Sequence, residues 1–257
     1  HRPCDKTENS SIPSALVLVL LLPATVHYYV VVVSVAVAIL LAVAAGRAAK
    51  PEARKLCNPC KPSGVMAVLG AGFMAATFVA KLALWDSSVV GRIIMAFLSL
   101  FCSAWLLALG RSWMSKSWKR PSDDLTHVVL GTAVFYWCVL ARFMENSSSW
   151  HRVAPTVVVW QMLAALVFLS VLGRALSLPD TADSRTLCAS GLTVWALCLC
   201  WELPQLLDTL LRGGVLARLP DFFFGLGLCC IGVLGGICAV RTTRTESGWE
   251  SARHSVG

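Results

Sequence analysis

The sequence predicts an all-α, polytopic integral membrane protein: a helical bundle with one or more amphipathic helices at the membrane interface. Of its 257 residues, 57% are hydrophobic and only 14% are charged, whereas a soluble domain carries about 25% charged residues. Mean hydropathy is +0.71. Apolar runs near the roughly 20 residues that cross a bilayer recur along the chain. A helix in lipid satisfies its own backbone hydrogen bonds, so the bilayer accommodates such runs.

The first apolar run covers about 14–45 and is interrupted only by Pro23 and His27. It is rich in valine and differs in composition from the rest, and Met66 is a plausible alternative start. Two alternatives are therefore open for residues 1–65: an apolar part of the functional protein, or an N-terminal extension outside it.

Residues 66–240 form the predicted multi-span membrane domain, and 241–257 form a polar, basic C-terminal tail. With the first run, the domain predicts four to seven crossings. Its apolar stretches cover about 64–84, 89–110, 127–143, 156–178, 187–201 and 222–240. The short break at 85–88 predicts either a tight hairpin or a helix partly in the interface, where Arg92 would avoid the cost of a charge in hydrocarbon.

Basic residues indicate the orientation of the chain. If it crosses seven times, the loops at 46–63, 111–126 and 174–186 share one side with the tail and hold most of the Lys and Arg. Because cytosolic loops carry an excess of these residues, we expect a cytosolic C-terminus. The net charge of +8 has the same explanation, so we expect no nucleic-acid partner.

A polar stripe recurs at helical spacing after Trp201, and leucines occupy the other face. We expect a short amphipathic helix along the membrane surface. Its predicted membrane-interface residues are Leu203, Leu206, Leu207, Leu210 and Leu211. Two interpretations stay open: an ordinary connector between spans, or a helix that inserts into one leaflet and bends the bilayer.

The last span, 222–240, is rich in glycine. Gly232 and Gly236 form a GxxxG pattern, with Gly225 nearby, and such small residues let two helix backbones approach closely in lipid. We therefore predict helix–helix contact at these three positions and a homo-oligomer.

No pattern in the chain is typical of catalysis. The sequence lacks GxSxG, HExxH and P-loop motifs and its histidines are scattered. Cys57 and Cys60 form a lone CxxC, whereas a structural zinc site needs four ligands. We expect no enzymatic activity, no cofactor and no metal site, and interpret this CxxC as a juxtamembrane loop.

Three stretches resemble the Pex11 family of peroxisomal and glycosomal membrane proteins. They are Phe78-Val79 through Asp86 to Arg92, then Phe135-Tyr136-Trp137 with Arg142-Phe143, and Glu202-Leu203-Pro204 followed by Leu219-Pro220-Asp221-Phe222 and the glycine-rich span. The resemblance covers about 78–240, although Asp86-Ser87-Ser88 stands where the family has an Asp-Gly-Arg-Asp-like step.

This resemblance implies a non-enzymatic protein of a peroxisomal or glycosomal membrane. It would promote organelle elongation, division and proliferation through insertion into the lipid bilayer, self-association and recruitment of organelle-division factors. Two other functions remain open: a small multi-span transporter or channel, and a membrane adaptor without remodelling activity.

Overall fold

The structure, a computed structural model, describes residues 24–48, 53–83, 90–116, 118–121, 125–144, 153–178, 183–211, 213, 215 and 218–243. All regular elements in these ranges are helical, which confirms the all-α prediction. The elements are α2 (Ala24–Ala48), η1 (Ala53–Cys57), α3 (Lys61–Ala83), α4 (Val90–Met114), α5 (Leu125–Met144), α6 (Val153–Ser177), α7 (Ser184–Leu197), η2 (Cys198–Glu202), α8 (Leu203–Leu211) and α9 (Leu219–Thr243).

Six helices in the described part of the chain are long and apolar enough to cross a membrane, which confirms the polytopic class. Five of them correspond to α3, α4, α5, α6 and α9. The sixth is a single helix of 28 residues, Ser184–Leu211, in which α7, η2 and α8 follow one another without a break. The predicted spans thus recur with ends shifted by a few residues, except that the fifth extends well beyond 201.

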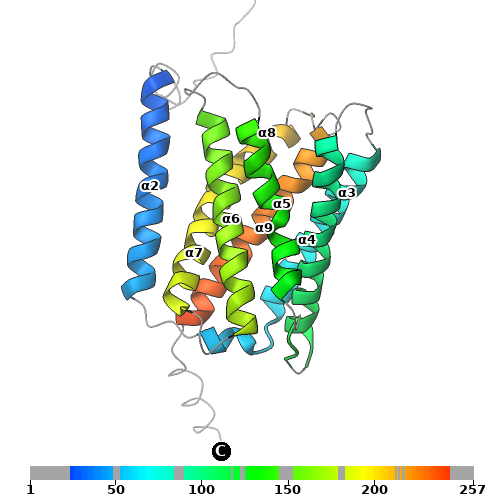
Figure 1. Cartoon of the computed structure of the whole chain (residues 1–257). Helices are drawn as coiled ribbons and strands as arrows, with labels where there is room; N and C mark the ends of the chain where they lie inside the picture. Colours follow the sequence, from blue (N-terminus) through cyan, green and yellow to red (C-terminus); the bar gives the residue numbers. More distant parts are fainter. Residues whose placement is uncertain are drawn as a thin grey trace, which may run out of the picture.

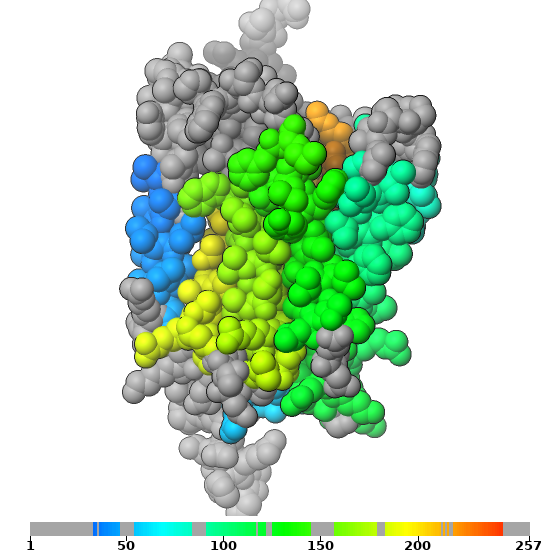
Figure 2. All heavy atoms as spheres, in the orientation of Figure 1, coloured from blue at the N-terminus to red at the C-terminus, as the bar shows by residue number. Residues whose placement is uncertain are grey.

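The six helices form a closed ring. Each packs on the next in the order α3, α4, α5, α6, α7, α9, and α9 returns to α3. Figure 1 shows these helices roughly aligned along one axis. The helix α2 stands outside the ring and packs chiefly on α7 (Figures 1 and 2).

The helices α3 and α4 form the hairpin that was one of the two alternatives for this region. At one end of the pair, a Cβ added to Gly64 would lie 3.1 Å from the Gly110 carbonyl oxygen. Further along, the Ser103 hydroxyl donates to the Ala71 carbonyl oxygen at 2.7 Å. Hydrogen bonds of this kind and small residues hold helices together in lipid, where the hydrophobic effect contributes little.

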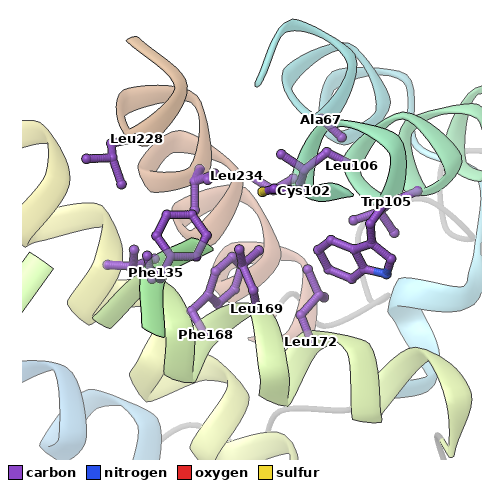
Figure 3. Packing of buried hydrophobic residues seen from close by; sticks show 14 of the residues in the cluster. Ala67, Cys102, Trp105, Leu106, Phe135, Phe168, Leu169, Leu172, Leu228 and Leu234 are labelled. Carbon is purple, nitrogen blue, oxygen red and sulfur yellow. The ribbon is translucent and has the colours of Figure 1, made fainter. Parts of the chain in front are cut away.

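The centre of the ring is filled by large side chains from several helices (Figure 3). Trp105 of α4, Phe135 of α5 and Phe168 of α6 are 0–4% exposed. The Phe135 ring lies 6.3 Å from that of Phe224 on α9, measured between centroids. Dispersion contacts across this interior, each small and together large, hold the ring closed.

Residues 53–60 cover one end of the bundle. The Trp113 indole N–H donates to the Leu56 carbonyl at 2.8 Å, and the Leu56 side chain is fully buried. The Arg241 guanidinium donates to the carbonyls of Lys55 and Asn58 at 3.0 and 2.9 Å. Residues 53–65 are therefore packed into the bundle, and α3 already begins at Lys61, before Met66.

Candidate functional site

Four of the five predicted interface leucines face outward. Leu203, Leu207, Leu210 and Leu211 are 46%, 50%, 58% and 85% exposed, whereas Leu206 is 7% exposed and points into the bundle. The amphipathic helix that carries them is not a separate element, because α8 forms the last turns of the helix that begins at Ser184. Its outward leucines lie on the surface of the bundle, whereas Glu202 and Thr209 are half-buried and Gln205 and Asp208 are exposed.

The three predicted glycines do lie at a helix–helix contact, but within the chain. A Cβ on Gly232 would lie 3.0 Å from the Cys198 Cβ, and one on Gly236 would lie 2.7 Å from Cδ1 of Trp195. A Cβ on Gly225 would lie 2.6 Å from Oε1 of the Glu202 carboxylate. The face that we expected to pair with a second copy is thus covered by α7 and η2, because these glycines allow α9 to approach them closely.

A polar cavity of about 440 Å³ opens at the end of the bundle where α8 lies, opposite to η1. Side chains from α5, α6, η2, α8 and α9 line it. Its polar lining consists of Arg142, Gln161, Glu202, Gln205, Thr209 and Asp221, with Arg218 just before α9. Volumes of 300–1,000 Å³ are usual for small-molecule sites. Because its lining combines acidic, basic and amide side chains, we take this cavity as the candidate site in the described part of the chain.

Glu202 and Gln161 form the inner polar pair of this cavity. The side-chain amide nitrogen of Gln161, which is fully buried on α6, donates to the Leu197 carbonyl and to the Glu202 carboxylate, both at 3.3 Å. Glu202 ends the π-helical turn η2. Such turns add a residue to a helix locally and are frequent at functional sites. The extra residue changes the direction in which the following side chains of the helix point.

The outer part of the cavity carries charges of both signs. Asp221 forms an ion pair of 3.8 Å with Lys81, which joins the last turn of α3 to the first turn of α9. Arg142 and Arg218 are both exposed. Screening by water weakens ion pairs with an exposed partner, so the outer charges differ physically from the half-buried Glu202 and its fully buried partner Gln161.

A second cavity, of about 670 Å³, lies on the side of the bundle between α2, α6 and α7. Ile39, Trp160, Leu163 and Val167 contribute to its mostly apolar lining. Two of the helices that border it, α6 and α7, belong to candidate membrane spans.

The two ends of the bundle differ in charge. The end that η1 covers, here called the basic end, gathers most of the described Lys and Arg. They are Arg54, Lys55, Lys61, Arg111, Lys116, Lys119, Arg120, Arg174, Arg185 and Arg241. The cavity end carries Lys81, Arg92, Arg142 and Arg218 among the residues described. The grouping of loops expected for seven crossings therefore matches the grouping at one end of the bundle.

Sequence reasoning placed Glu202 on a polar stripe but did not identify Gln161 as its partner. The signal was present, since Gln161 is the only amide side chain in the apolar run 156–178. The sequence alone did not show that Gln161 contacts Glu202, because Glu202 belongs to η2, which only the structure reveals. Cys57 and Cys60 lie at the basic end and form no disulfide with a described cysteine, and Cys60 accepts a hydrogen bond from Ser63. No group of three or more His, Cys, Asp or Glu suited to a metal occurs among the described residues.

No protein-family model matches this chain, and no characterised protein or solved structure shows a significant match to it.

Proposed function

We propose that this chain shapes the membrane of a peroxisome-type organelle and thereby promotes its elongation, division and proliferation. The outward leucine face of α8 carries the proposal. Leu207, Leu210 and Leu211 are exposed at one end of the bundle, next to polar side chains of the same helix, and would meet lipid there. Apolar volume added to a single leaflet expands that leaflet and favours curvature. The resemblance at Glu202-Leu203-Pro204 and over the last span supplies the assignment to this organelle.

The connection of α8 to a membrane-crossing helix supports this mechanism. A free amphipathic helix binds reversibly and is sensitive to lipid composition. In contrast, α8 continues from η2 and α7, so its depth is set by a helix that crosses the bilayer. The leucine face is therefore held permanently in one leaflet, and its effect on curvature depends on the number of copies present.

Reconstitution into giant vesicles tests the proposal. The chain should draw tubes from the vesicles, and the double variant Leu207→Ser/Leu210→Ser should lose this ability. The matched control is Val129→Ser/Leu130→Ser on α5, which changes two residues that are 65% and 39% exposed near the basic end. Leu206 is unsuitable for this test because it is buried. Equal tube formation by the two double variants would refute the mechanism.

The assignment to an organelle has its own test. A fluorescently tagged full chain should coincide with a marker of peroxisomes or glycosomes, and its overproduction should elongate them. Residence in the secretory pathway or plasma membrane would refute this part and leave the vesicle result untouched.

Self-association is part of the same proposal, since crowding of many copies adds to curvature. The Gly232 and Gly236 face is occupied by the chain itself, so the contact between copies uses another surface. Light scattering of the purified chain in detergent should give a mass above 27.7 kDa once the detergent is subtracted. A monomer would remove self-association from the proposal, and binding of division factors would then be its remaining route to fission.

A second candidate function is a small transporter or channel, favoured by one observation. The cavity contains Glu202 between membrane-crossing helices, and ionisable residues in such positions commonly mark solute pathways. Flux of a cation into proteoliposomes that contain the wild-type chain but not the Glu202→Gln variant would support it.

A further inference from the structure

Glu202 is an acid that shares its cavity with Arg142 and Arg218 but is not ion-paired with either. No Lys or Arg of the described residues forms an ion pair with it, and among these residues its side chain accepts a hydrogen bond from Gln161. Arg142 and Arg218 line the cavity but are exposed, whereas Gln161 at its inner wall is fully buried. A charged carboxylate in an apolar interior is costly unless an opposite charge accompanies it.

Gln161, which lines the same cavity, carries a second buried acceptor. Its amide nitrogen faces two acceptors, the Leu197 carbonyl and the Glu202 carboxylate. Reversal of the amide would bring three oxygens together, so the observed orientation is the one that hydrogen bonding permits. The amide oxygen is then buried and has no hydrogen-bond partner among the described residues. A buried oxygen without a partner costs free energy, so a ligand that donated a hydrogen bond to it would gain binding free energy.

The rest of the lining is apolar and includes aromatic, sulfur-containing and aliphatic side chains. Trp137, Phe222, Phe224 and Met162 contribute to the wall of the cavity. Aromatic rings attract a cation over their faces, and the attraction grows when water is excluded. An acidic group, an unsatisfied carbonyl oxygen and aromatic rings together favour a ligand with a positive, hydrogen-bond-donating head.

We propose that this cavity binds a small organic ammonium ion, with its N–H groups donating to the Glu202 carboxylate and the free Gln161 oxygen. A primary amine supplies three donors, enough for both acceptors. A compact alkyl chain would extend along the aromatic wall toward the open end. The inference concerns only what the cavity binds, and it rests on neither the membrane-shaping proposal nor transport.

Isothermal titration calorimetry of the full chain in detergent tests this inference with butylammonium as the probe. We expect binding at millimolar concentration or below. Its neutral counterpart, 1-butanol, and its anionic counterpart, butyrate, should bind at least about tenfold more weakly because neither offers a positive head to Glu202. Equal binding of butanol or butyrate would overturn the proposal, as would the absence of measurable heat with butylammonium.

Two variants separate the site from general electrostatics. Glu202→Gln should weaken butylammonium binding about tenfold or more while it keeps the shape of the cavity. The control Asp208→Asn removes the same charge from an exposed position on the same helix that does not line the cavity, and its affinity should match the wild type. Unchanged affinity in Glu202→Gln would overturn the proposal.

Gln161→Met provides an independent check, since it removes the unpaired oxygen and keeps the volume. It should also weaken binding. Circular dichroism confirms the fold of each variant, and Glu202→Gln should be at least as stable as the wild type because it buries no charge. If Glu202→Gln does not fold, undiminished binding by Gln161→Met would overturn the proposal in its place.

Discussion

Gly191 of α7 and Gly235 of α9 face each other so closely that a Cβ on either would lie 2.7 Å from the carbonyl oxygen of the other. The two backbones are in direct contact at this point. Dispersion and weak Cα–H···O contacts can act there because no side chain intervenes. This contact brings α9 close to the helix that carries η2 and α8.

Gly235→Ala should therefore destabilise the protein by about 1–3 kcal/mol, the usual range for an added methyl in a filled interior. Its new Cβ would overlap the Val194 side chain. Denaturation by sodium dodecyl sulfate, followed by circular dichroism, measures this. The control Gly72→Ala adds a methyl with nothing within 4 Å, and it should be neutral or gain helix propensity. Equal stabilities of the two variants would contradict the close contact.

Removal of the segment before Met66 should destabilise the bundle more than removal of the chain before Ala53. The shorter deletion keeps Leu56, which is fully buried, and the carbonyl groups that Trp113 and Arg241 contact. Loss of one buried leucine side chain alone costs about 2–5 kcal/mol. Thermal unfolding of the two truncated chains in the same detergent measures the difference, and indistinguishable melting temperatures would show that η1 does not stabilise the fold.

Asp183 should stabilise α7 through its N-cap. It accepts hydrogen bonds from the Thr186 hydroxyl and the Arg185 backbone N–H, and these lower the pKa of its carboxyl group. Asp183→Ala should cost about 1 kcal/mol at neutral pH. Because the folded pKa lies below the unfolded one, the charged contribution is complete above about pH 4 and is lost as the pH falls through the folded value.

Asp183→Asn is the matched control, since an amide also caps a helix but does not titrate in this range. Its stability should show no such loss with falling pH. Unfolding curves of the three chains between pH 2.5 and 7, run in a nonionic detergent, make the comparison. A gap between wild type and Asp183→Ala that is the same at both extremes of pH would contradict the capping role of the carboxylate.

The basic end should face the cytosol. Cytosolic segments are enriched in Lys and Arg, and this end holds Arg54, Lys55, Arg111 and Arg241 among others. A tag fused after Gly257 should therefore be degraded by protease added to intact organelles, whereas a tag inserted between α5 and α6, after residue 145, should survive until detergent is added. Protection of the C-terminal tag would reverse the orientation.

Much of the fold could be predicted from hydropathy because each crossing needs a long apolar run. The helices α3, α4, α5, α6 and α9 lie close to the predicted stretches. The fifth stretch was cut short at Trp201, since Glu202, Gln205 and Asp208 interrupt the apolar pattern there. In the structure these polar residues belong to the same helix, whose leucines face lipid while Glu202 and Gln205 line the polar cavity.

What the sequence by itself determined is the class of protein: all-helical, embedded in lipid and asymmetric in charge. These properties follow from composition and from the length of hydrocarbon that a helix must cross. The tertiary structure alone decided which apolar face meets protein and which meets lipid. It directed Gly232 and Gly236 toward α7, Leu207 and Leu210 outward, and Gln161 toward Glu202. In a membrane both kinds of face are apolar, so hydropathy does not distinguish them, and only the packing of one helix against another does.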